Sequence, residues 1–153
     1  MSRWVLLAYR LPREPSTPRI TLWRQLRRLG VAQVADGVVA LPLDARTREQ
    51  LDWLADDVVE NGGEATIWLS EPGSAAQARA LAQQMADSIA AEYRDVIAVA
   101  QGPQASDAAR RRTHARLRRD LQRIGARDYF PGIFRDHARS AVEALSVGIE
   151  VAS

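Results

Sequence analysis

Residues 31–43 read VAQVADGVVALPL. The two short apolar runs of this stretch flank an Asp-Gly pair, which is a strong signal for a tight β-hairpin. We therefore predict strands over residues 31–34 and 38–43, joined at Ala35-Asp36-Gly37. The rest of the chain can be interpreted outward from this hairpin.

A helix and then a strand are predicted on each side of the hairpin. Upstream, Gly30 supplies a stop for a helix over residues 17–30, and the continuous apolar run in residues 3–10 is typical of a strand buried on both faces. Downstream, we predict a helix over about 45–61 and a strand over 64–69. The order is β-α-β-β-α-β, the split βαβ pattern of ferredoxin-like sheets.

The remainder of the sequence shows helical periodicity only. Helices are expected over about 74–99, 105–125 and 133–147, separated by Gly-Pro turns. We therefore expect an α+β protein with two parts. Residues 1–70 would form a ferredoxin-like domain with a four-stranded antiparallel sheet, and residues 71–153 a helical extension packed on it.

The composition excludes several classes of site. The 153 residues are 46% apolar and include no cysteine and two histidines. Thiolate sites are therefore excluded, and few side chains are present that could serve as nitrogen ligands of a metal ion. The apolar runs are too short to span a membrane, and Arg10 interrupts the first run too early for a secretory signal. We expect a cytoplasmic protein with no membrane association, no cofactor, no metal, no catalytic residue and no enzymatic activity.

Positive charge is concentrated at the two ends of the chain. Residues 1–30 contain seven arginines and one acidic residue, residues 31–100 four arginines and twelve acidic residues, and residues 101–153 ten arginines and six acidic residues. A net charge of +2 hides this separation. Local basic segments attract anionic ligands such as nucleic acid.

The first helix has the most informative pattern. One helical arc is apolar and is expected to pack on the sheet: it contains Leu22, Trp23, Leu26 and Leu29. The other tryptophans also lie in apolar patterns and are expected in the core: Trp4, Trp53 and Trp68. Arg24, Arg27 and Arg28 fall on the neighbouring arc, with no acidic residue three or four positions away, and Arg19 lies at the helix entry. Guanidinium groups pair with phosphate and can bind guanine edges. Two interpretations stay open: a DNA-binding face, or a solvated face paired with acidic residues elsewhere.

A second cluster of arginines lies in the helix predicted over 105–125. Leu117, Leu121 and Ile124 form its apolar stripe. Its seven arginines face one acidic residue within the cluster, Asp120: they are Arg110, Arg111, Arg112, Arg116, Arg118, Arg119 and Arg123. Pairing with the acidic residues of 49–60, within the fold or across a dimer, is the simpler interpretation, and contact with nucleic acid is the alternative.

Several spaced motifs resemble one family. They are Tyr9-Arg10-Leu11-Pro12-Arg13-Glu14-Pro15-Ser16, Leu22-Trp23-Arg24, Asp36-Gly37-Val38, Arg46-Thr47-Arg48-Glu49-Gln50, Gly62-Gly63-Glu64-Ala65 and Asp128-Tyr129-Phe130-Pro131-Gly132. They resemble the N-terminal region of ChrB-type regulators of bacterial chromate resistance. The resemblance implies operator binding by Arg19 and Arg24, and less directly by Arg27 and Arg28. It does not imply chromate sensing, which belongs to a C-terminal domain beyond these motifs.

Three functional interpretations follow from the sequence. The first is a DNA-associated regulatory module resembling the ChrB N-terminal region, with duplex DNA as its partner. The second is an interaction module that dimerises through a sheet edge or the C-terminal helices and binds no nucleic acid. A homodimer is predicted in any case on two grounds, the open edges of a four-stranded sheet and the apolar surface of the Ala-rich stretch 74–100. The third is a relative of small CRISPR-associated nucleases, but Tyr9-Arg10 stands where those nucleases place a metal-binding aspartate, and an arginine repels a divalent cation.

Overall fold

The computed structural model describes the backbone of residues 3–152 and the side chains of residues 3–147. The predicted domain limits at residues 1 and 153 lie outside the described residues. The elements, in chain order, are β1 (Trp4–Arg10), α1 (Thr17–Leu29), β2 (Ala32–Ala35), β3 (Val38–Pro42), α2 (Ala45–Glu60), β4 (Glu64–Ser70), α3 (Ala75–Gln101), α4 (Asp107–Gly125) and α5 (Ile133–Ala152). Each predicted helix and strand is present, with ends shifted by a few residues.

The four strands form one antiparallel sheet in the order β2-β3-β1-β4. β1 is central: Leu6 lies opposite Ala40 of β3 and opposite Trp68 of β4. β3 separates β1 from β2, and β1 separates β3 from β4, so both β-α-β units are split. The predicted α+β class and the four-stranded antiparallel sheet are confirmed.

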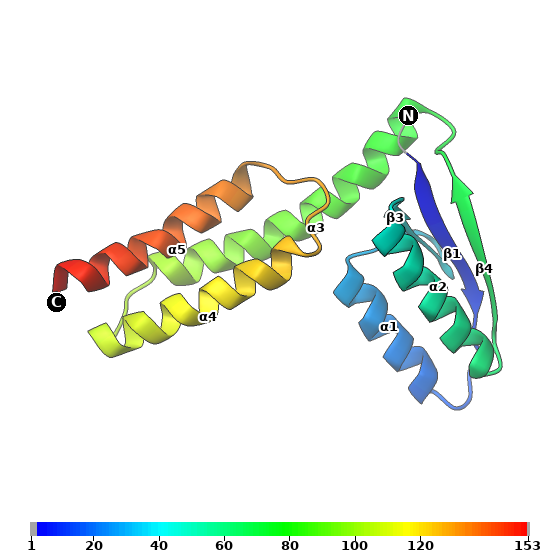
Figure 1. The fold of residues 1–153 in the computed structure, drawn as a ribbon, viewed down its shortest axis with the longest axis horizontal. Coiled ribbons are helices and arrows are strands. Elements are labelled where there is room, and N and C mark those ends of the chain that lie inside the picture. The colour runs from blue at the N-terminus through cyan, green and yellow to red at the C-terminus, as the bar shows by residue number, and fades with distance from the viewer. Residues whose placement is uncertain (1–2, 153) are drawn as a thin grey trace. The chain divides into compact units, whose positions relative to one another are not determined.

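One face of the sheet is covered by α1 and α2, which lie on the same side of it (Figure 1). Alternate residues of β1 point to this face, and Val5 and Leu7 are completely buried. The helices contribute Leu22, Leu51 and Val58 to the same core. Both early helices therefore pack on one face of the sheet and share one core with it.

The other face of the sheet is partly covered by the beginning of α3. The Gln84 side chain accepts a hydrogen bond of 2.9 Å from the backbone N–H of Gln33 at the sheet edge. Contacts divide the chain into two compact units inside α3, between Gln84 and Met85. The first turns of α3 therefore belong to the unit that contains the sheet.

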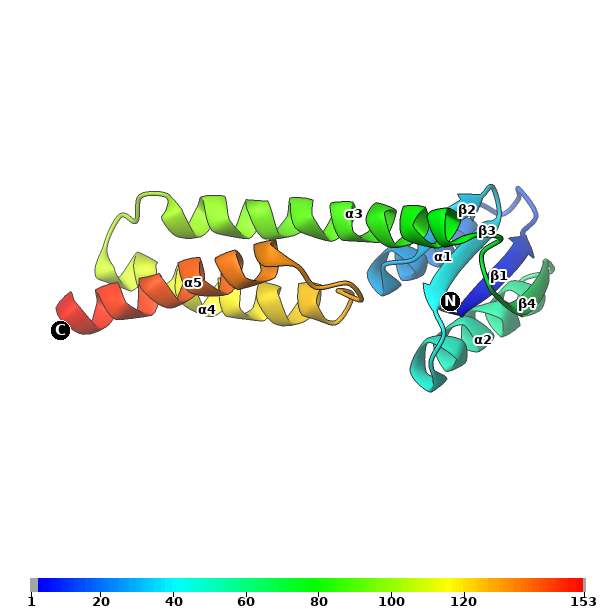
Figure 2. The ribbon, with the colours of Figure 1, turned by 90° about the horizontal axis from the view of Figure 1, so that it is seen from above.

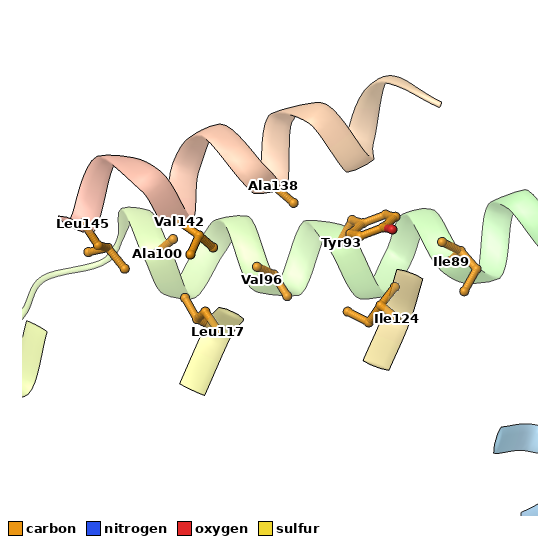
Figure 3. Close-up of a cluster of buried hydrophobic side chains, with 9 residues drawn as sticks. All are labelled: Ile89, Tyr93, Val96, Ala100, Leu117, Ile124, Ala138, Val142 and Leu145. Carbon is orange, nitrogen blue, oxygen red and sulfur yellow. The ribbon is translucent and has the colours of Figure 1, made fainter. Parts of the chain in front are cut away.

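The second unit is built from the rest of α3 together with α4 and α5, which lie side by side in Figure 2. Its buried side chains, drawn in Figure 3, come from all three helices: Ile89, Tyr93, Val96, Ala100, Leu117, Ile124, Ala138, Val142 and Leu145. The Ala-rich helix thus covers its apolar side within its own chain. This removes one of the two grounds on which the sequence predicts a homodimer.

The tryptophans correct the sequence-based prediction of the core. Trp4 is 1% exposed, as predicted, but Trp23, Trp53 and Trp68 are 57%, 62% and 57% exposed. Trp23 lies at the margin of the α1 stripe, 100° from Leu22 around the helix axis. Trp53 lies on α2 well away from its buried stripe of Leu51, Leu54 and Val58, and Trp68 lies on the edge strand β4. None of the described helices is long and apolar enough to cross a membrane.

Candidate nucleic-acid interface

α1 is held against the sheet by a narrow apolar stripe. Leu22 and Leu26 are buried, and Gly30 ends the helix in the left-handed conformation at φ 75°. Because these leucines fix the rotation of the helix, the opposite side faces outward. The four arginines predicted as DNA contacts are all exposed: Arg19, Arg24, Arg27 and Arg28.

These four arginines have no carboxylate partners in the described part of the chain. The ion pairs Arg48–Asp52, Arg123–Asp120 and Arg127–Glu92 lie elsewhere in the described residues, and none of them involves α1. Pairing with the acidic middle segment, the competing interpretation, is not observed for these side chains. The outward side of α1 therefore presents uncompensated positive charge.

An aromatic ring adds to this surface. The guanidinium carbon of Arg27 lies 4.8 Å from the centroid of the exposed Trp23 ring. This is a cation–π contact, which orients the guanidinium and leaves its N–H donors available. Ile20, one turn before Arg24, is also exposed, at 47%. The outward side of α1 thus combines basic groups with exposed hydrophobic surface.

An open groove of about 860 Å³ lies between the first turns of α1, the end of β1 and the hairpin turn. Arg10 and Arg19 line it together with Tyr9, Trp23 and Asp36. The other three arginines do not line it. The structure therefore separates the predicted set: Arg19 joins Arg10 at the groove, whereas Arg24, Arg27 and Arg28 lie on the outer side of α1.

Tyr9 reports on the electrostatics of this groove. Burial raises the pKa of the Tyr9 phenol, the positive charge of Arg19 opposes the rise, and the negative charge of Asp36 adds to it. The phenol is therefore neutral at pH 7 and can donate a hydrogen bond. The backbone N–H of Tyr9 donates to the Gly37 carbonyl over 2.8 Å, which fixes the hairpin turn beside the phenol.

Two features of the groove escape the sequence-based reasoning. Arg10 is the last residue of β1, and nothing in the linear pattern places it at the same groove as Arg19. Trp23 is 100° from Leu22 around the helix, so its position at the border of the stripe is a signal of exposure that the sequence analysis did not use. Within the described residues, no three Asp, Glu, His or Cys side chains gather to hold a metal ion.

Comparison with known proteins places this surface in a family. A family model described as the N-terminal region of protein ChrB matches residues 19–109. The chain belongs to this family. Protein ChrB of Cupriavidus metallidurans is 35% identical over 66 residues, which are 43% of this chain and 20% of that relative. The chain thus aligns with about a fifth of the length of its ChrB relative. No solved structure matches the chain.

The ChrB N-terminal match begins within the site. It includes Arg19, Arg24, Arg27 and Arg28 with the exposed Trp23, and it extends through the hairpin, α2, β4 and α3 to the start of α4. β1, with Tyr9 and Arg10, lies before the matched residues. The residues matched by the ChrB family model therefore include the arginines on the outer side of α1 but only some of the residues that line the groove.

Proposed function

We propose that this ChrB N-terminal domain is a DNA-associated regulatory module without enzymatic activity. The observation that supports it best is the outer side of α1, where Arg24, Arg27 and Arg28 are exposed, unpaired by carboxylates and held outward by a buried leucine stripe. Guanidinium groups in this state form bidentate bonds with phosphate and lose little hydration when they do so. The proposal assigns no catalytic residue.

The arginines divide into two roles under this proposal. Arg24 and Arg28 follow one another by one turn of α1, so both can contact the phosphates of one strand. Arg27 is held by the Trp23 ring and is the best oriented of the set. Arg19 and Arg10 attract an anionic group into the groove, where the Tyr9 phenol can donate a hydrogen bond.

The family supports this proposal through the resemblance to chromate-resistance regulators. The matched family is the N-terminal part of ChrB, and the predicted DNA contacts Arg19 to Arg28 all lie inside it. Sensing of chromate is not part of the proposal, because the resemblance associates it with a C-terminal domain beyond the motifs found in this sequence.

The test is the salt dependence of binding to duplex DNA from upstream of the protein's own gene. Each phosphate contact contributes about 0.9 to the slope of log K against log salt. The double variant Arg24→Ala/Arg28→Ala should lower that slope by about 1.8 and remain folded. Arg46→Ala/Arg48→Ala, which removes two exposed arginines from α2, is the matched control and should change the slope far less.

Two results would contradict the proposal. One is an unchanged slope in a folded Arg24→Ala/Arg28→Ala variant. The other is an equal loss in the α2 control, since the effect would then follow net charge rather than the α1 surface. Cleavage of the duplex on addition of a divalent cation would contradict the non-enzymatic part of the proposal.

A second candidate function, homodimerisation without DNA, has its own support. Trp68 and Val34 are 57% and 46% exposed on the sheet face that α3 covers only in part. A groove of about 480 Å³ beside them is lined by Leu6, Val34 and Leu81. Apolar area of this kind is typical of interaction surfaces. Light scattering of a high-micromolar solution should give about twice 16.9 kDa, and a monomer mass would exclude this candidate.

A further inference from the structure

The outward face of α4 is the largest accumulation of uncompensated charge outside α1. Two buried residues, Leu117 and Ile124, fix the rotation of α4 in its helical bundle. The helix begins at Ser106, whose side chain caps the backbone N–H of Ala109 over 3.1 Å. The position of each arginine around the helix axis is therefore determined.

Two arginines elsewhere in this bundle have partners inside it. Arg127 forms a two-bond ion pair with Glu92, one bond of which is 2.9 Å. Arg94 lies 4.9 Å from the centroid of the Phe134 ring. The Arg127 guanidinium is therefore engaged by a carboxylate of the bundle, and Arg94 lies against an aromatic ring of α5.

Two arginines of α4 itself also face carboxylates. Arg123 pairs with Asp120 over 2.9 Å. Arg116 and Arg123 line a small groove of about 230 Å³ together with Glu92, Asp95 and Asp120. The charge on this side of α4 is therefore balanced within the bundle.

The four remaining exposed arginines form two rows on the outer side. Arg111 and Arg118 are seven residues apart and share one row, and Arg112 and Arg119 form the other, about 100° away. Between the rows lie Ala108, Ala115 and Gln122, all exposed and uncharged. Within the described residues, none of the four arginines forms an ion pair.

We propose that this face, formed by Arg111, Arg112, Arg118 and Arg119, is a second contact for the phosphate backbone of duplex DNA. Small residues along the centre let an extended polyanion lie close to the helix, and arginines on both sides can donate to its oxygens. The two pairs are about 10 Å apart along the axis, a length over which duplex DNA presents several phosphates. Such contacts strengthen binding without selecting a sequence.

This inference rests on the proposed function, since it takes the same ligand. It does not rest on the family, because the four arginines lie beyond residues 19–109, where the family match ends. The acidic side of α2, with Glu49, Asp56 and Glu60 exposed, offers a different partner in a second copy of the chain. The experiment has to separate these two partners.

The decisive comparison uses two double variants that remove equal charge from one helix. Arg111→Gln/Arg118→Gln removes one row of the outer face, and Arg116→Gln/Arg123→Gln removes the two arginines that face carboxylates. Each full-length protein is titrated with the upstream duplex and with a shuffled duplex of the same length, over a range of salt concentrations. Circular dichroism confirms that each variant is folded.

We expect the Arg111→Gln/Arg118→Gln variant to lower the salt slope by about 1.8 on both duplexes. Its affinity should fall by the same factor for the upstream and the shuffled duplex, because phosphate contacts do not depend on sequence. The Arg116→Gln/Arg123→Gln variant should keep most of the wild-type slope.

An unchanged slope in the folded outer-face variant, or an equal loss in both variants, overturns the inference. Salt-sensitive self-association that disappears in the outer-face variant, with DNA binding unchanged, also overturns it and assigns the face to the acidic α2 of a second copy. If Arg24→Ala/Arg28→Ala lowers the slope and the α4 variant does not, the proposed function stands alone. The reverse result supports α4 and contradicts the assignment to α1.

Discussion

Trp23 and Leu26 show how two large apolar residues on one helix can have opposite roles. Trp23 is 57% exposed and lies against the Arg27 guanidinium, whereas Leu26 is 4% exposed in the core beneath the sheet. The indole contributes to the surface of α1, and the leucine contributes to its attachment. Substituting each by alanine separates the two contributions.

Leu26→Ala should lower the free energy of unfolding by about 2–5 kcal/mol, because it leaves a cavity in a packed core. Trp23→Ala should lower it by less than about 1 kcal/mol, since most of the ring is already in water. The same Trp23→Ala variant should bind duplex DNA more weakly, as Arg27 loses the ring that orients it. Urea unfolding of both variants measures the stabilities, and similar losses in the two would contradict the assigned orientation of α1.

At the scale of an element, α2 begins with a reciprocal cap. The Thr47 N–H donates to the Asp44 side chain over 2.8 Å, and the Thr47 hydroxyl accepts from the Asp44 N–H over 3.0 Å. The same hydroxyl donates to the carbonyl of Pro42 at the end of β3 over 2.6 Å. Thr47 is completely buried, so this hydroxyl ties the helix to the sheet away from water.

Thr47→Val keeps the shape of the side chain and removes the hydroxyl. The Pro42 carbonyl and the Asp44 N–H then lose a partner at a part-buried position, which should cost about 1–3 kcal/mol. Thr66→Val on the exposed side of β4 is the matched control and should change stability by less than about 0.5 kcal/mol. Thermal unfolding of the two variants gives the comparison, and equal midpoints would show that the cap does not stabilise α2.

In the helical bundle, Tyr93 of α3 links to the turn before α5. Its hydroxyl donates to Asp128 over 2.9 Å, and burial together with this bond raises the pKa of Tyr93 to about 12. The unfolded chain loses the phenol proton near pH 10, whereas the folded chain keeps it to about pH 12. The stabilisation from this group is therefore complete below about pH 10 and is lost as the pH rises toward 12.

Tyr93→Phe should lower stability near pH 8, because Asp128 loses a donor, and should weaken the further loss of stability above about pH 10. Urea unfolding of wild type and variant at about pH 9 and about pH 11 measures the difference. Parallel losses for the two proteins across this interval would show that Tyr93 is not responsible for the alkaline transition.

Local signals explain why the elements could be predicted and the surface only in part. Asp36-Gly37 predicts the hairpin because tight turns of this kind need a residue with positive φ, which glycine adopts most easily. In the structure Gly37 has φ 73°, and a Cβ there would lie 2.6 Å from the Tyr9 carbonyl oxygen. Helical periodicity places Arg24 and Arg28 outward for the same local reason. Periodicity cannot predict that Trp23 stays exposed or that Arg10 and Arg19 line one groove, because both outcomes depend on long-range packing.

For the whole molecule, charge is the property that connects sequence to proposed function. The excess of arginine in residues 1–30 and in residues 101–153 corresponds to two exposed surfaces, the outer side of α1 and the outer face of α4. The acidic middle segment contributes the exposed acidic side of α2. In the described residues, its carboxylates form no ion pair with the arginines of either surface. The small net charge of +2 therefore conceals two separate sites for an anion.

The most direct test of the central claim is the salt slope of the wild-type protein on duplex DNA. Four phosphate contacts from α1 predict a slope of log K against log salt of at least about 3 in magnitude, and contacts from α4 would make it steeper. The measurement is a fluorescence anisotropy titration of a labelled upstream duplex at several salt concentrations. A slope near zero, or no binding at the lowest salt, would contradict the account.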